Sequence, residues 1–269
     1  MSTRPGQQAL TLIAISLTFA SGAADVASFT TLGGVFTSVM TGNIVLWGLA
    51  AARGSLSLAS HTAVAIAGYI TGVACGTWVA HSVKASGASG ASGSPDGERA
   101  MPAHVNWALS AEFIMLAGFA AGWEIDGASP TGWAQYALLA VLAAAMGVQS
   151  SAVKDMGLTE VSTTYLTGTL TGLVASLASP GQDTPHGLRR FGVLIGLVAG
   201  ASLCGLLVAT AAAGVPALPL AALAFTLLLA SGPGRPRWLR LGPAGSGGSA
   251  GPGGPAGSDG PAGPGGAGR

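Results

Sequence analysis

Long apolar stretches alternate with short polar connections over most of this chain of 269 residues. Several stretches reach the roughly 20 residues that an α-helix needs to cross a bilayer, whereas those beginning near Val35, Val161 and Pro216 are marginal. The stretches cover residues 8–28, 35–52, 57–83, 105–123, 132–153, 161–179, 188–214 and 216–231. This pattern predicts an all-α fold, a polytopic bundle of transmembrane helices.

The composition supports a membrane protein. Hydrophobic residues make up 49% of the chain and charged residues 8%, against roughly 25% charged residues in a soluble domain. The lipid bilayer is therefore the expected partner, and the net charge of +1 excludes a nucleic-acid binder, which needs a basic face. Cys75 and Cys204 both lie in apolar stretches, which argues against a disulfide framework or a Cys-x-x-Cys metal site. We expect no metal and no cofactor.

Polar segments set the domain boundaries. Residues 84–103 are rich in Ser and Gly and indicate a flexible loop. Residues 241–269 consist mainly of Gly, Pro, Ala and Ser without a strict glycine period, which is typical of a disordered tail and not of collagen. We expect residues 1–240 to form one transmembrane domain made of two repeats, about 8–124 and 132–231.

The repeat is visible as a polar motif that occurs twice, about 125 residues apart. Gly22-Ala-Ala-Asp25 is followed by Met40-Thr-Gly-Asn43, and Gly147-Val-Gln-Ser150 is followed by Leu166-Thr-Gly-Thr169. Hydroxyl, amide and carboxylate groups within apolar stretches are costly unless they have a role. Matching polar, glycine-broken helices in two halves of a membrane protein indicate the binding site of a transporter.

The similarity extends to the glycines of the third and seventh stretches. Gly68, Gly72 and Gly76 correspond to Gly196, Gly200 and Gly205, at an offset of about 128. Small residues four apart let helix backbones approach closely, so we expect these two stretches to be closely packed inner helices.

The distribution of Lys and Arg favours six full spans. If all eight stretches cross, Lys84, Arg99 and Lys154 lie outside, against the positive-inside rule. If the two Thr-Gly stretches are re-entrant, only Arg53 lies outside among the loops near the membrane. We therefore predict six spans plus two short broken or re-entrant helices, an inverted internal repeat and both termini in the cytoplasm. Eight full spans, with a parallel repeat, remain the alternative.

These motifs resemble a known family. Gly22-Ala-Ala-Asp25, Met40-Thr-Gly-Asn43 and Leu166-Thr-Gly-Thr169 are similar to those of the YoaK-like family of bacterial inner-membrane proteins, over about residues 8–231. The resemblance implies a multi-pass protein of the bacterial inner membrane, of unknown function, and carries no catalytic or ligand residues. The chain departs from the family at Gln149-Ser150, where Gln-Asn is common.

The polar residues of the repeated motif are the candidate substrate site. A helix N-terminus with unpaired N–H groups and hydroxyl side chains can hold a carboxylate or another small anion. The candidate residues are Thr41, Gly42, Asn43, Gln149, Ser150, Thr167, Gly168 and Thr169. The alternative is ordinary N-capping by Ser and Thr, which also involves Thr37, Ser38 and Ser162.

Of the ten acidic residues, only Asp25 and Glu112 fall within predicted spans. A charge at mid-membrane costs about 2.5–3.5 kcal/mol on insertion scales, and no Lys or Arg lies mid-span to pair with them. We therefore hypothesise that both residues couple an ion or a proton. The alternative is two buried neutral carboxyls that are hydrogen-bonded to Thr, Ser or backbone groups.

The remaining polar residues suggest no enzyme. The spacing of His61, His81, His104 and His186 fits no metal motif, and we expect these side chains to be solvated at span ends. A phosphate-binding loop, a second mid-span Asp and a Gly-x-Ser-x-Gly elbow are missing from the sequence. The sequence thus favours a secondary transporter or permease for a small solute, with a site at the repeat interface. A non-transporting scaffold or accessory subunit is the alternative, and the solute, coupling ion, direction and oligomeric state are not fixed by the sequence.

Overall fold

The computed structural model describes residues 5–85, 103–156, 166–178 and 184–231. The chain divides into two units, Met1–Leu239 and Arg240–Arg269, and only the first contains described residues. The predicted tail at 241–269, nearly all of the predicted loop at 84–103 and residues 161–165 of the second motif lie outside the described residues.

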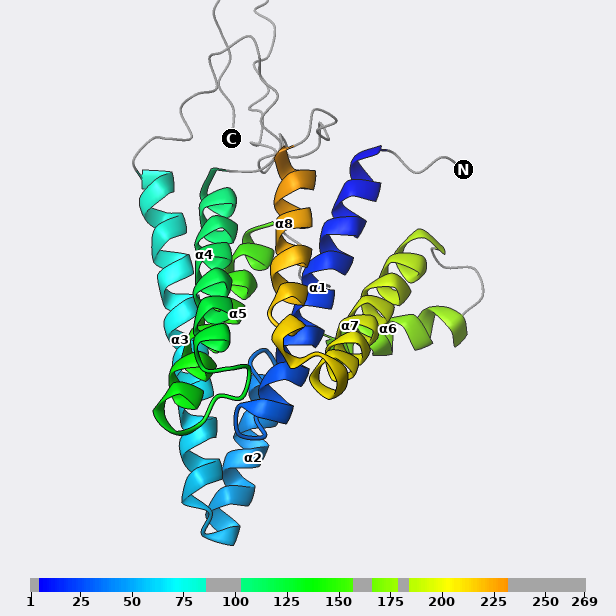
Figure 1. Cartoon of the computed structure of the whole chain (residues 1–269). Helices are drawn as coiled ribbons and strands as arrows, with labels where there is room; N and C mark the ends of the chain where they lie inside the picture. Colours follow the sequence, from blue (N-terminus) through cyan, green and yellow to red (C-terminus); the bar gives the residue numbers. More distant parts are fainter. Residues whose placement is uncertain (1–4, 86–102, 157–165, 179–183, 232–269) are drawn as a thin grey trace, which may run out of the picture. The chain divides into compact units, whose positions relative to one another are not determined.

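The described residues form helices and no strand, which confirms the all-α, polytopic class (Figure 1). The helices are α1 (Pro5–Thr31), α2 (Met40–Arg53), α3 (Leu56–Ala85), α4 (Ala103–Ile125), α5 (Gly132–Asp155), α6 (Leu166–Ala178), α7 (Thr184–Thr210), the 3-10 turn η3 (Ala212–Gly214) and α8 (Ala217–Ser231).

Six of these segments are long and apolar enough to cross a membrane. They are Gln8–Thr31, Leu56–Val83, His104–Ile125, Gly132–Asp155, Arg189–Thr210 and Ala212–Ala230. The other two helices, α2 and α6, have 14 and 13 residues and are about 20 Å long at 1.5 Å per residue. They are too short for a hydrocarbon core of about 30 Å, so the predicted six long and two short helices are confirmed.

Two predicted helix boundaries are wrong. The apolar stretch predicted at 35–52 is helical only from Met40, because residues 32–39 form a bent, non-helical segment. The stretch predicted at 188–214 ends its helix at Thr210, and a separate 3-10 turn leads into α8.

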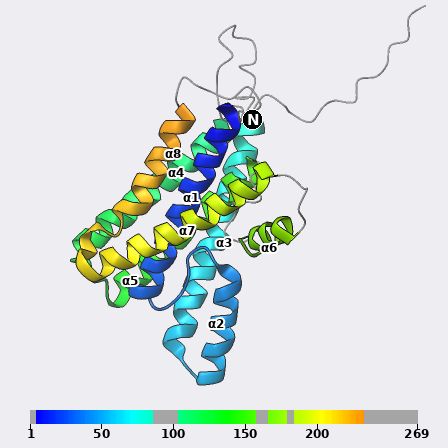
Figure 2. The same ribbon diagram turned by 90° about the vertical axis from the view of Figure 1, so that its right-hand side faces the viewer.

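The long helices α1, α3, α5, α7 and α8 pack mainly on helices that are not their neighbours in sequence, whereas α4 packs mainly on α5. The most extensive contacts join α3 to α5 and α1 to α7, while α2 packs on α3 and α6 packs on α7 (Figures 1 and 2). Four further contacts, α1–α5, α5–α4, α4–α8 and α8–α1, close a ring of four helices. The shared interior of this ring is the core of the bundle.

Glycine makes the two extensive contacts close. A Cβ at Gly68 of α3 would lie 2.8 Å from the carbonyl oxygen of Ala140, and one at Gly72 would overlap that of Ala144. From the other side, a Cβ at Gly147 of α5 would overlap the carbonyl oxygen of Tyr69. The two backbones therefore touch over more than one helical turn, which strengthens van der Waals contact in a bilayer.

The contact between α1 and α7 has the same construction. A Cβ at Gly196 of α7 would lie 2.9 Å from the carbonyl oxygen of Ile15, and one at Gly200 would overlap that of Phe19. A Cβ at Gly22 of α1 would in turn overlap the carbonyl oxygen of Leu197.

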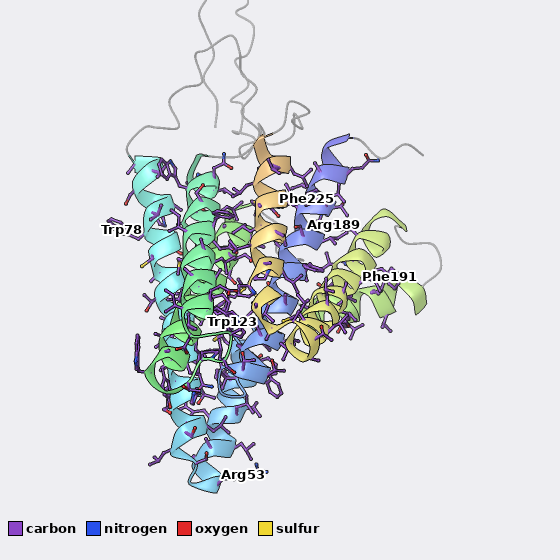
Figure 3. All side chains as sticks on the ribbon, viewed as in Figure 1. Arg53, Trp78, Trp123, Arg189, Phe191 and Phe225 are labelled. Carbon is purple, nitrogen blue, oxygen red and sulfur yellow. The ribbon has the colours of Figure 1, made fainter. Side chains whose placement is uncertain are left out.

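The predicted close packing of the third and seventh stretches is therefore correct, but their predicted inner position is wrong. Only 22% of the apolar window of α3 and of α7 is buried, against 61% for α1 and α5. The glycines occupy a single face of each helix, and the opposite face is exposed, as Trp78 illustrates (Figure 3).

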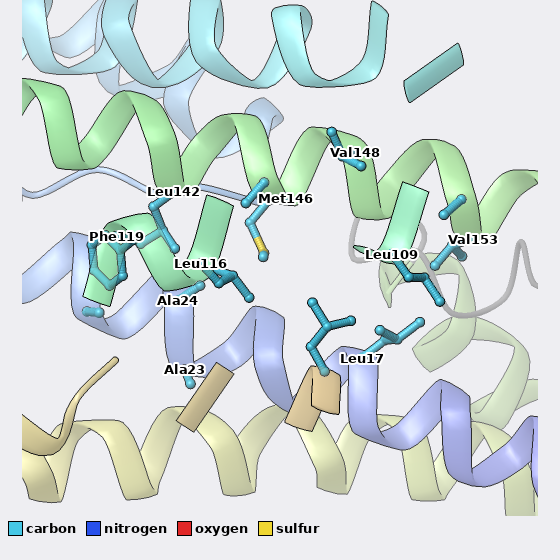
Figure 4. Close-up of a cluster of buried hydrophobic side chains, with 14 of the residues drawn as sticks. Leu17, Ala23, Ala24, Leu109, Leu116, Phe119, Leu142, Met146, Val148 and Val153 are labelled. Carbon is cyan, nitrogen blue, oxygen red and sulfur yellow. The ribbon is translucent and has the colours of Figure 1, made fainter. Parts of the chain in front are cut away.

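Large apolar side chains fill the ring of four helices. Leu17 of α1, Leu109 and Leu116 of α4, and Leu142 and Met146 of α5 are at most 1% exposed and belong to one cluster (Figure 4). At one end of α4, the buried Trp123 donates its indole N–H to the carbonyl oxygen of Ala212 at 3.0 Å. This bond ties α4 to the turn between α7 and α8.

A methyl group at Gly72 should destabilise the bundle. Gly72→Ala and Gly200→Ala should each lower the free energy of unfolding by about 1–3 kcal/mol, because the added Cβ overlaps a fixed carbonyl oxygen. Gly118→Ala in α4 is the matched control, because its Cβ would meet nothing within 4 Å. Thermal unfolding in detergent measures the three midpoints. Equal midpoints for Gly72→Ala and Gly118→Ala would contradict the close contact.

Candidate membrane-embedded polar site

The bent segment at residues 32–39 joins α1 to α2 and carries the hydroxyls of Thr37 and Ser38. Gly33 and Gly34 have φ angles of +99° and +74°, a backbone region that favours glycine. A Cβ at Gly33 would also overlap the ring of His61 on α3. The chain can therefore turn out of α1 here and still pack against α3.

Asp25 of α1 holds this segment in place. Its Oδ1 accepts hydrogen bonds from the backbone N–H groups of Thr37 and Ser38, both at 2.8 Å, and from the Thr37 hydroxyl at 3.2 Å. Its Oδ2 accepts the Ser38 hydroxyl. Asp25, Thr37 and Ser38 are all buried. Four donors on one carboxyl group favour its ionised form, since a carboxylate is acceptor-only.

Asn43 and Ser28 make further hydrogen bonds to the segment. The Oδ1 of Asn43 accepts the backbone N–H of Phe36 at 2.9 Å, and its Nδ2 donates to the carbonyl oxygen of Phe36 at 2.6 Å. The Ser28 hydroxyl donates to the carbonyl oxygen of Val35 at 2.8 Å. Asn43 is thus fully buried and bonded to the segment that precedes its helix.

The alternative of simple N-capping does not describe α2. The N-cap residue is Val39, and no side chain caps the helix there. The hydroxyls of Thr37 and Ser38 donate to Asp25 instead.

Gln149 of the second motif bonds to α1, the helix that carries Gly22–Asp25 of the first motif. Its Nε2 donates to the carbonyl oxygen of Leu17 at 3.1 Å and to the Ser21 hydroxyl at 3.0 Å, so it joins α5 to α1. Its Oε1 is buried and has no hydrogen-bond partner among the described residues. The neighbouring Ser150 hydroxyl donates to the Met146 carbonyl oxygen of its own helix.

The remaining candidates lie on the two short helices. Thr41 is exposed and Gly42 half-buried at the start of α2, while Thr167 and Gly168 are exposed and Thr169 is buried at the start of α6. Because α2 packs on α3 and α6 on α7, the two groups belong to different helix pairs (Figure 2). The structure therefore unites Asn43 with the segment that Asp25 holds, and Gln149 with α1. A composite site from both short helices stays a prediction.

Glu112 has an environment unlike that of Asp25. Its side chain is 0% exposed, and neither carboxyl oxygen has a hydrogen-bond partner among the described residues. The two acids hypothesised to act in coupling therefore differ: Asp25 is fully hydrogen-bonded, and Glu112 is not.

No group of three or more His, Cys, Asp or Glu residues able to hold a metal occurs in the described part of the chain. The donors at the polar segment are hydroxyl and backbone groups that already bond to Asp25 or Asn43. The arrangement can therefore hold a non-helical backbone segment in place.

The sequence reasoning missed a polar network around His61. We expected solvated histidines, yet His61 is 4% exposed, its Nε2 lies 3.2 Å from Gln135 Oε1, and its ring stacks on Tyr136. Gln135 Nε2 donates to the carbonyl oxygen of Thr31 at 2.8 Å. The network links α1, α3 and α5.

His104 is a second wrong prediction of the same kind. It is 8% exposed, and its Nε2 lies 3.3 Å from Asp155 Oδ2, which joins the start of α4 to the end of α5.

Comparison with known proteins gives two matches. A family model described as "Protein of unknown function (DUF1275)" matches residues 13–230. The chain is also 30% identical over 162 residues to the UPF0700 transmembrane protein YoaK of Bacillus subtilis (strain 168). That alignment covers 60% of this chain and 64% of the relative, so it spans less than two thirds of the relative's length. No solved structure matches. The resemblance to a YoaK-like family is confirmed.

Removal of the Asp25 charge should loosen the segment at 32–39. Asp25→Asn replaces one acceptor oxygen by an amide group that faces donors. We expect the free energy that holds the segment in its packed position to fall by about 2–4 kcal/mol, since each hydrogen bond to a charged group contributes about 1.5–3 kcal/mol. Glu124→Gln, at an exposed position, is the control. The readout is thiol labelling of Val35→Cys, a fully buried position, with Cys75 and Cys204 replaced by Ala. Labelling at the same rate in the Asp25→Asn and Glu124→Gln proteins would mean that Asp25 does not anchor the segment.

Proposed function

The chain belongs to the DUF1275 family of proteins of unknown function, so its role has to follow from its own geometry, and we propose that it is a secondary transporter or permease for a small solute. The site lies at the interface between two repeats, about residues 8–124 and 132–231. The observation that carries this proposal is the exchange of helices between the halves, in which α1 packs on α7 and α3 packs on α5.

Equivalent residues in the two halves make equivalent contacts, which supports an internal repeat. Gly22 and Gly147 lie 125 positions apart, and each approaches a carbonyl oxygen of a helix in the other half. Gly72 and Gly200 lie 128 positions apart and do the same. The partner carbonyls belong to Ala144 and Phe19, which are again 125 positions apart. Two glycine-rich helices of arbitrary origin have no reason to share both offsets.

The order of elements supports an inverted repeat. Each half contains a long helix, a short helix, a second long helix and a fourth helix, and three of the four are long enough to span. An odd number of spans per half turns the second half over relative to the first. Inverted repeats with discontinuous helices are typical of secondary transporters, which bind substrates where the repeats meet.

The interface also suits a movement of one half of the protein against the other. The contacts between halves run along two helix pairs whose surfaces are smooth, because glycine faces backbone in both pairs. Such surfaces suit the rocking of one repeat against the other that gives alternating access. The polar groups of Asp25, Asn43 and Gln149 lie on or beside α1 and α5, the two inner helices.

A specific observation favours the alternative of a non-transporting scaffold. The polar groups of the first motif already have hydrogen-bond partners. Asp25 accepts hydrogen bonds from Thr37 and Ser38, and Asn43 bonds to both the N–H and the carbonyl oxygen of Phe36. A motif that is complete without a ligand fits a structural element as well as a binding site.

We propose cytoplasmic termini in the bacterial inner membrane, from the charge pattern. Reporter fusions truncated after Lys84 and after Lys154 should both show cytoplasmic activity, because α2 does not cross the membrane. A fusion after Arg53, at the end of α2, should show external activity and serves as the internal control. External activity at both lysines would mean that α2 crosses the membrane, which would overturn the six-span arrangement.

Water access separates transporter from scaffold. In a protein without its native cysteines, Thr41→Cys, Asn43→Cys and Thr167→Cys should react with a small polar thiol reagent in the membrane if a solute path exists. Leu142→Cys, at a fully buried core position, is the control and should not react. Three unreactive positions in a folded protein would favour the scaffold.

A further inference from the structure

Glu112 lies in the interior of the four-helix ring without a partner for its carboxyl group. The ring is formed by α1, α5, α4 and α8, which contact one another in that closed order. Glu112 is on α4, is 0% exposed, and neither of its oxygens has a hydrogen-bond partner among the described residues. A buried polar group in a folded protein normally has a partner, so this pair of oxygens requires an explanation.

The surroundings of Glu112 on its own helix are apolar. Leu109 lies three residues before it and Leu116 four residues after it, so all three share one face of α4. Both leucines are 0% exposed and belong to the core cluster with Leu17 and Met146 (Figure 4). An ionised carboxylate in such a place is strongly disfavoured, because nothing replaces the water that it loses.

The neighbouring elements offer no cation to offset a negative charge, as far as the described residues go. On α4 and α5, His104 and Asp155 pair with each other, and His104 is eight residues, or about 12 Å, from Glu112. Lys154 of α5 and Glu124 of α4 are exposed. On α8, residues 217–231 contain no titratable group.

On α3 and α1, the titratable side chains that the structure describes contact other side chains, are exposed or, for Tyr69, are half-buried. On α3, His61 contacts Gln135, and Cys75 and His81 are exposed. Tyr69 of α3 is half-buried, and Tyr136 of α5 stacks on His61. On α1, Asp25 is bonded to Thr37 and Ser38.

A second orphan acceptor lies at the same level of the ring. Gln149 Oε1 of α5 is buried without a partner among the described residues. The helices α4 and α5 pack together, and Figure 4 shows Leu116 of α4 near Met146 of α5 and Leu109 near Val153. Glu112 lies between the two leucines on α4, as Gln149 lies between Met146 and Val153 on α5.

We propose that Glu112 is a proton-binding site and that its carboxylic O–H donates a hydrogen bond to the Oε1 of Gln149. One proton then satisfies two groups that are otherwise orphaned. The Nε2 of Gln149 already donates to Leu17 and Ser21, so its Oε1 is the end of the amide left for Glu112. The proposal separates the two intramembrane acids, because Asp25 receives four donors and needs no proton.

The bound proton is a property of the resting protein and does not depend on transport. Its release in a transport cycle rests on the proposed function, because water or a solute would have to enter the ring and supply donors to the carboxylate. An alkali cation is the competing occupant, but it needs several oxygen ligands, and the neighbouring positions on α4 are Leu109 and Leu116.

Infrared spectroscopy of the purified, full-length protein tests the proposal. At neutral pH, the spectrum should contain the carbonyl stretching band of a buried carboxylic acid. Glu112→Gln should abolish that band, and Asp25→Asn should leave it unchanged. Gln149→Leu should keep the band and shift it to the higher frequency of an acid without a hydrogen bond, which tests the acceptor even if Glu112→Gln folds poorly.

The outcomes are distinct. Absence of the band in the wild-type protein, or its persistence in folded Glu112→Gln, would overturn the proton site. Loss of the band on addition of sodium chloride at constant pH would assign the site to a cation and overturn the proton assignment. An intact band in a protein that fails the water-access test for transport would support the proton site and count against the proposed function.

Discussion

Direct contact between helix backbones is the interaction on which this bundle depends. Inside a bilayer the lipid chains are as apolar as Leu, so apolar side chains alone give helices little reason to associate. Gly72 and Gly147 bring α3 and α5 together, and Gly22 and Gly200 do the same for α1 and α7. Where glycine faces a carbonyl group, packing reaches a density that larger side chains would prevent.

The second constraint concerns backbone that leaves the helix among membrane spans. N–H and C=O groups in such a segment need partners from the protein, because lipid offers none. Residues 35–38 obtain such partners from three side chains, Asp25, Ser28 and Asn43, which lie on the helices before and after the turn. This explains why an acid and an amide occur in an otherwise apolar region, whether or not the segment also binds a solute.

Much of the fold followed from hydropathy, because eight apolar stretches became eight α-helices. The start of α2 did not, since Val35 and Phe36 are apolar but non-helical. Val35 is held by Ser28, seven residues earlier, and Phe36 by Asn43, seven residues later. Glycine spacing predicted which helices pack closely. It could not predict that α3 and α7 lie outside, because a glycine face says nothing about the opposite face.

The polar site was less predictable, because its partners are distant in sequence. The interpretation of Asp25 as a carboxyl bonded to Thr, Ser and backbone groups agrees with its contacts, although four donors suit an ionised group rather than a neutral one. Glu112 meets no such donors among the described residues. His61 was misjudged because its partner Gln135 lies 74 residues away, where no local pattern reveals it.

The exchange of helices between halves also sets an order for assembly during synthesis. When α1 enters the membrane, its main partner α7 has not been translated, and the residue that accepts the Ser16 hydroxyl lies 206 positions ahead. The glycine face of α1 therefore stays exposed to lipid or to the insertion machinery while α3 and α5 pack together first. Only the arrival of α7 and α8 can close the structure. A ribosome that stalls after α5 thus leaves a nascent chain in which the glycine face of α1 has no helix to cover it.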